Sequence, residues 1–290
     1  MVNGRLSRDD FYAVLGQLDE ADLKKALWTL YWRGSADFRD RIMAAIDPAV
    51  AAAQASKKAT PVDAVRLESE VKEFAALARE GAYLGRDRRV SPKERTRWRF
   101  IFRSHATAAT QALAGHDIIP AASAMATLID LAGEMRARDY FRSEDPIEAA
   151  RFVVSEAAAV MWSAIRREQG HDAFCEQVAP QFLRWESCWG WTRRGEGWVV
   201  EQETSLTQVI AGMLPIPDAW GQFAEVYLRA LDAEAGRSRS SSRRTEGMSL
   251  RARRENLAEW HAMLQERLAD GEYHDTLDRI MNHPALKSRK

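Results

Sequence analysis

The spacing of the apolar residues is the feature that most limits what this chain can fold into. Leu23, Leu27 and Leu30 follow the i, i+4, i+7 pattern of one helical face, and similar stripes recur along the sequence. Strict alternation of apolar and polar residues, which is typical of a half-buried strand, is nearly absent. Residues 198–200 (WVV) form the one short run that resembles a strand. We therefore predict an all-α protein.

Helix start and stop signals agree with this periodicity. Ser91 and Glu94 flank Pro92 in a capping box, and Asp145 precedes Pro146 in the same way. Glycines follow several of the periodic segments, at the position where a left-handed residue ends a helix. The predicted helices span residues 8–16, 19–33, 36–46, 61–80, 92–114, 119–137, 146–169, 171–188, 203–213, 217–235, 249–270 and 273–282.

The predicted helices form pairs whose spacing is typical of helical repeats, but no residue signature recurs from pair to pair. The fold class that we predict is an irregular helical bundle or a degenerate, HEAT-like helical stack, with a tethered C-terminal helical hairpin. The segments are an N-terminal helical unit (1–47), a main helical body (61–235), an Arg/Ser-rich linker (236–248) and the hairpin (249–290). Because the hairpin is too short to build its own core, we expect it to dock on the body or on a partner.

Composition excludes several classes of protein. The 290 residues include 42 basic and 42 acidic side chains, and 46 % are hydrophobic, so the chain is not intrinsically disordered. No apolar run is long enough to span a membrane, and the N-terminus has no signal-peptide pattern. Only two cysteines are present, Cys175 and Cys188, which argues against a disulfide framework. We expect a cytoplasmic protein, and the 34 arginines among the 42 basic residues are typical of a GC-rich bacterial genome.

The net charge of zero conceals a segregation of charge. Residues 86–103 have eight basic and two acidic side chains, and residues 237–254 have seven arginines and one glutamate, so each segment has a net charge of +6. The rest of the chain must then have a net charge of −12. Two basic segments on an acidic body could bind a polyanion, or could bind the protein's own acidic surface.

One basic stripe lies on the predicted helix that begins at Pro92. Arg95, Arg99 and Arg103 are spaced i, i+4, i+8 and so lie on one face. These guanidinium groups could neutralise the phosphates of DNA or RNA. The alternative is a solvated helix face that is paired with acids on a neighbouring helix such as 61–80.

An aromatic cluster is the least ordinary feature of the sequence. Four of the ten tryptophans fall within fourteen residues: Trp185, Trp189, Trp191 and Trp198. Arg193 and Arg194 lie between the last two and could stack on their rings. Since tryptophan is enriched in binding hot spots, this Trp/Arg loop is our candidate site for a protein partner. The alternative is a loop that aromatic anchors hold against the body.

Signatures of enzymes are largely missing. The sequence has no phosphate-binding glycine loop, no dinucleotide fingerprint and no nucleophile elbow. Glu168 and His171 match one half of a di-iron motif, but no second copy exists. Cys175 follows His171 at i, i+4, which a nucleophilic pair would allow, although its apolar neighbours are typical of a core cysteine. We predict no catalytic residue, no metal site and no cofactor.

These observations lead to three functional hypotheses. The first is a non-enzymatic adaptor or scaffold that binds another protein through the Trp/Arg loop and the docking C-terminal tail. The second is a nucleic-acid-binding protein that uses Arg95, Arg99, Arg103 and the Arg-rich linker. The third is a helical enzyme whose motif is not recognised. The sequence predicts no association with a membrane and leaves the oligomeric state open.

Overall fold

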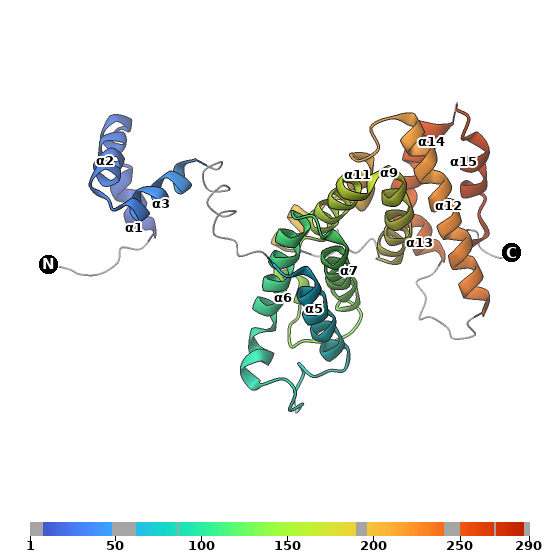
Figure 1. The fold of residues 1–290 in the computed structure, drawn as a ribbon, viewed down its shortest axis with the longest axis horizontal. Helices are drawn as coiled ribbons and strands as arrows, with labels where there is room; N and C mark the ends of the chain where they lie inside the picture. The colour runs from blue at the N-terminus through green and yellow to red at the C-terminus, as the bar shows by residue number, and fades with distance from the viewer. Residues whose placement is uncertain are drawn as a thin grey trace. The chain divides into compact units, whose positions relative to one another are not determined.

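The structure is a computed structural model that describes residues 8–47, 62–85, 87–189, 196–240, 250–269 and 271–286. Every regular element among these residues is a helix and none is a strand, which confirms the all-α prediction and is compatible with a helical bundle. The chain divides into two compact units, Met1–Pro61 and Val62–Lys290 (Figure 1).

The first unit contains three helices, α1 (Arg8–Leu15), α2 (Glu20–Arg33) and α3 (Ala36–Ile46). The side chains of Asp19 and Ser35 cap α2 and α3 by accepting hydrogen bonds from backbone N–H groups in the first turn. α2 packs on α3, but none of the side chains of α2 is buried. The local sequence therefore specifies these helices, while the described side chains of the unit form little core.

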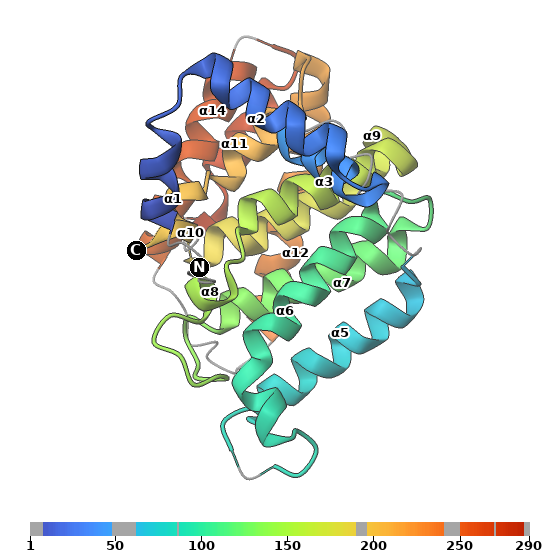
Figure 2. The ribbon, with the colours of Figure 1, turned by 90° about the vertical axis from the view of Figure 1, so that its left-hand side faces the viewer.

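The second unit begins with the helices α5 (Ala64–Arg79), α6 (Pro92–Leu113) and α7 (Ile118–Glu134). The capping box predicted from Ser91 and Glu94 is present at the start of α6. α7 packs on both α5 and α6, and Figures 1 and 2 show the three helices side by side. Their facing sides are lined by alanine, leucine and phenylalanine, which lets the helices approach closely.

The single helix predicted over 146–169 is wrong, because the chain breaks there into α8 (Pro146–Ala150) and the start of α9 (Val154–Trp189). Arg151 ends α8 with a left-handed backbone, at a φ of 49°. The carboxylate of Glu203 then accepts hydrogen bonds from the first two backbone N–H groups of α9, at 2.5 and 3.0 Å. A cap from so distant a residue leaves no local signal in the sequence.

The long helix α9 is the centre of the second unit. It contacts α6, α7, α11, α12 and α13, so it links the first helices of the unit to the last (Figures 1 and 2). Gly170 interrupts it with a φ of 84°, at the position where the sequence predicted a helix end. α9 therefore consists of two helical parts joined at Gly170.

The remaining elements are α10 (Trp198–Gln202), α11 (Leu206–Ala211), α12 (Pro217–Ser240), α13 (Leu250–Asn256), α14 (Ala258–Leu268), α15 (His274–Met281) and a 3-10 helix η2 (Pro284–Leu286). The expectation of a strand-like run at 198–200 is wrong, since these residues begin α10, where Glu148 accepts a hydrogen bond from the N–H of Val199 at 2.8 Å. α13 packs on α9, and α14 and α15 pack on α12. The C-terminal helices thus pack back onto the body.

The predicted linker 236–248 begins inside α12, which continues to Ser240. The described residues of the second unit share one hydrophobic core that runs from α5 to η2. None of the helices in the described ranges is long and apolar enough to cross a membrane.

Candidate functional site

Trp185, the first residue of the predicted aromatic site, is part of the core. Its side chain is only 3 % exposed and stacks on Trp162 with a centroid distance of 5.9 Å. Its indole N–H donates to a carboxylate oxygen of Asp130 at 2.8 Å, and Arg184 donates to the same carboxylate at 2.6 Å. With its indole N–H and one ring face engaged, Trp185 holds α9 against α7 and offers little surface to a partner.

The other residues of the Trp/Arg loop are only partly described. Trp198 is 44 % exposed, and the guanidinium of Arg151 lies 5.5 Å from the centre of its ring. Trp189 is the last residue of α9. Three members of the loop lie outside the described residues: Trp191, Arg193 and Arg194. The structure therefore describes only the two ends of the loop, at Trp185 and Trp198.

Two arginines of the predicted basic stripe bind backbone carbonyls of this chain. Arg95 donates to the carbonyl oxygens of Val90 at 2.8 Å and of Asp87 at 2.6 Å, and so fixes the loop before α6. Arg103 donates to the carbonyl of Ala149 at 2.8 Å, at the C-terminal end of α8. Within the described ranges, neither guanidinium is paired with an acid of a neighbouring helix, and both bind carbonyl groups of the fold.

Four other residues of α6 form an exposed patch that we call the α6 cationic face: Lys93, Arg97, Arg99 and Phe100. Within the described part of the chain, none of its three cations forms an ion pair. Phe100 is 46 % exposed, and the guanidinium of Arg99 lies 4.9 Å from its ring centre. The face thus combines free positive charge with an exposed aromatic ring.

A groove of about 560 Å³ runs along this face, lined by Lys93, Arg97, Phe100 and the neighbouring His105. Burial lowers the pKa of His105, so its ring is neutral at pH 7. The one acid in the lining, Glu94, accepts a hydrogen bond from the backbone of the capping box at 2.9 Å. The free charge of the groove is therefore positive.

Sequence reasoning named Arg99 of this face but missed Lys93, Arg97 and Phe100, although the signal was present. Lys93, Arg97, Phe100 and Ser104 are spaced by 4, 3 and 4 residues, which is the pattern of one side of a helix. The stripe through Arg95 lies closer to the buried side of α6, where carbonyl groups of the fold lie within reach.

The first unit has a second unusual surface, which we call the N-terminal aromatic surface. Trp28 and Trp32 on α2 are 60 % and 69 % exposed, and their rings stack at 5.7 Å. This surface is defined by Trp28 and Trp32. The other exposed large apolar residues of the unit are Phe11, Tyr12, Val14, Leu18, Leu27, Leu30, Phe38 and Ile46. So much exposed apolar area on about 40 residues is typical of a binding surface rather than of an isolated domain.

The candidate nucleophile is a buried thiol. The Cys175 sulfur lies 3.4 Å from Nε2 of His171, but burial raises the pKa of the thiol to about 12. Glu168 instead pairs with Arg167 at 2.7 Å. Because the thiolate is the reactive form, Cys175 in this setting is not an activated nucleophile. The described residues contain no cluster of three or more histidine, cysteine, aspartate or glutamate side chains that could hold a metal ion.

Comparisons with protein-family models, with curated proteins and with solved structures find no match to this chain. Its function has to be inferred from the geometry of its own surfaces.

Proposed function

We propose that this protein is a non-enzymatic α-helical adaptor that binds another protein through its N-terminal aromatic surface. The observation that supports this most is the exposure of Trp28 and Trp32 on a unit with little core. Tryptophan contributes a large contact area at a low cost in conformational entropy, and protein interfaces are enriched in it. Binding to another protein would bury this exposed apolar area.

A double substitution tests this function. Trp28→Ser with Trp32→Ser should reduce the capture of a specific partner at least tenfold, since interface tryptophans contribute about 2 kcal/mol or more each. The measurement is quantitative capture by the full chain, compared with the wild type and with Ile216→Ser, which removes an exposed apolar residue of the second unit. Circular dichroism should show unchanged helicity in both variants.

Two outcomes would contradict the adaptor. One is a set of captured proteins that the double substitution leaves unchanged. The other is a purified protein that forms a homodimer which the same substitution dissociates, because the surface would then be covered by a second copy of the chain.

A second candidate function, binding of single-stranded nucleic acid, is favoured by the α6 cationic face. Lys93, Arg97 and Arg99 can contact successive phosphates, while Phe100 offers a ring on which a base can stack. Three phosphate contacts predict a salt slope of about −2, so binding should weaken about twentyfold between 50 and 200 mM salt.

Replacing Lys93, Arg97 and Arg99 together by glutamine should abolish most of this binding, as followed by the fluorescence anisotropy of a labelled single-stranded RNA or DNA. The matched control replaces Lys24, Lys25 and Arg33 of α2, which removes the same charge elsewhere. Equal weakening by both variants would contradict a site on α6, since it would indicate attraction by net charge alone.

A further inference from the structure

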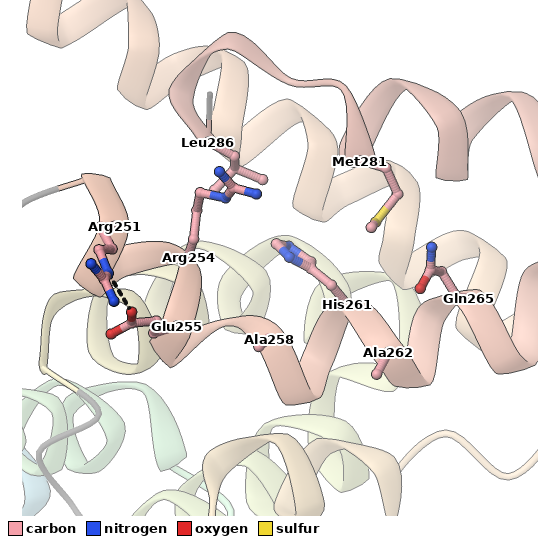
Figure 3. Close-up of a pocket in the computed structure, with 9 residues that line it drawn as sticks. All are labelled: Arg251, Arg254, Glu255, Ala258, His261, Ala262, Gln265, Met281 and Leu286. Carbon is pink, nitrogen blue, oxygen red and sulfur yellow. Dashed lines mark hydrogen bonds and ion pairs between the residues drawn. The ribbon is translucent and has the colours of Figure 1, made fainter. Parts of the chain in front are cut away.

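A pocket near the C-terminus has a lining that differs from the α6 cationic face and from the N-terminal aromatic surface. It has a volume of about 660 Å³, within the range of small-molecule sites, and lies between α13–α14 and the chain that leads from α15 to η2. Figure 3 shows the residues that line it: Arg251, Arg254, Glu255, Ala258, His261, Ala262, Gln265, Met281 and Leu286. We call it the C-terminal pocket.

Its charged residues leave one positive charge without a partner. Arg251 and Glu255 form an ion pair at 2.9 Å and neutralise each other at one end. Arg254 forms no ion pair with any described residue, and its guanidinium extends into the same space as the ring of His261 (Figure 3). A guanidinium presents two parallel N–H groups, which match the two oxygens of a carboxylate.

His261 adds a neutral hydrogen-bond donor. Its Nε2 lies 3.2 Å from the hydroxyl of Tyr227, whose side chain is fully buried. We assign the buried Tyr227 hydroxyl as the donor to Nε2, since no other hydrogen bond engages it among the described residues. The ring proton of neutral His261 then lies on Nδ1. Nδ1–H is then free to donate to a ligand.

The rest of the lining is mainly apolar. Ala258, Ala262, Met281 and Leu286 supply small or aliphatic surface, and the amide of Gln265 lies at the far end (Figure 3). The two alanines leave the space open, while the methionine side chain can adapt to the shape of an aliphatic group.

We infer that the C-terminal pocket binds a small organic monocarboxylate with an aliphatic tail, whose carboxylate contacts Arg254 and His261. The single unpaired charge matches a monoanion better than a phosphate dianion, for which only one cation would be available. The tail would lie along Ala258, Ala262 and Met281. This site is independent of the proposed adaptor function.

The test uses the full-length protein and octanoate as the probe, with isothermal titration calorimetry as the measurement. Octanoate should bind with a stoichiometry of one, while octanamide and inorganic phosphate should bind at least tenfold more weakly. Arg254→Gln should weaken octanoate at least tenfold. The matched control, Arg279→Gln, removes an exposed arginine of α15 outside the pocket and should leave the affinity unchanged.

A second variant separates the pocket from a general effect of charge. Ala258→Phe fills the pocket from an exposed position and should abolish binding without loss of helicity. No binding of octanoate at millimolar concentration would overturn the inference. Phosphate binding as tight as octanoate would overturn it as well, and so would unchanged affinity in either Arg254→Gln or Ala258→Phe.

Discussion

Replacing Trp260 by alanine should lower the free energy of unfolding of the second unit by about 3–5 kcal/mol, the range for removing a buried aromatic side chain. Trp260 on α14 is fully buried and lies between α9 and α12. Its ring centre is 5.1 Å from Phe182 of α9 and 5.7 Å from Trp220 of α12. The alanine variant would leave a cavity where three helices meet, so the C-terminal helices should also exchange their amide protons faster.

Trp260→Phe is the matched control. The indole N–H of Trp260 is buried without a hydrogen-bond partner among the described residues, so phenylalanine keeps most ring contacts and removes an unpaired donor. We expect its loss of stability to be less than half that of the alanine variant. Urea denaturation followed by circular dichroism measures both variants. A loss below about 1 kcal/mol for Trp260→Ala would contradict a central role for this residue in attaching α14.

The elements that depend on local signals could be predicted from the sequence. The capping box at Ser91, the break at Gly170 and the apolar stripes gave the positions of most helices. The break between α8 and α9 could not be predicted, because it depends on Glu203, about fifty residues further along the chain. Residues 198–200 resembled a strand, but α10 forms there with a hydrogen bond to Glu148.

The candidate sites show the same division between local and distant contacts. The spacing of Arg103 left two alternatives, contact with a polyanion or pairing with an acid on a neighbouring helix. Its partner is instead the carbonyl of Ala149, 46 residues away. Trp185 could have been a contact for a partner or an anchor to the body, and its N–H donates to the carboxylate of Asp130. Spacing along a helix predicts which residues share a face, but only tertiary contacts decide whether that face is exposed.

The C-terminal pocket illustrates the limit of sequence reasoning most directly. Arg254, Ala258, His261 and Gln265 recur at the spacing of one helical face, so one wall of the pocket is visible in the sequence. The opposite wall, at Met281 and beyond, comes from a later segment that returns across α12. Neither wall alone would indicate a site.

Acid should destabilise the second unit because His261 is held neutral in the folded protein. Burial lowers the pKa of His261 to about 4, from its ordinary value of 6.5, and the positive charges of Arg253 and Arg254 on α13 add to the effect. The unfolded chain therefore binds a proton between pH 6.5 and 4 that the folded chain does not. His261 therefore does not lower the free energy of unfolding above pH 6.5. It lowers this free energy by about 3 kcal/mol as the pH falls from 6.5 to 4.

His261→Gln isolates this effect from the titration of the carboxylates. The amide oxygen of glutamine can still accept a hydrogen bond from Tyr227 but takes up no proton, so the variant should lose less stability than the wild type between pH 7.5 and 4. Urea denaturation at each pH measures the free energy of unfolding of both proteins. The value for His261→Gln relative to the wild type should rise by about 3 kcal/mol over this range. His116→Gln, which removes a fully exposed histidine of the second unit, is the matched control. Parallel profiles for the wild type and His261→Gln would contradict the neutral state of His261 in the folded protein.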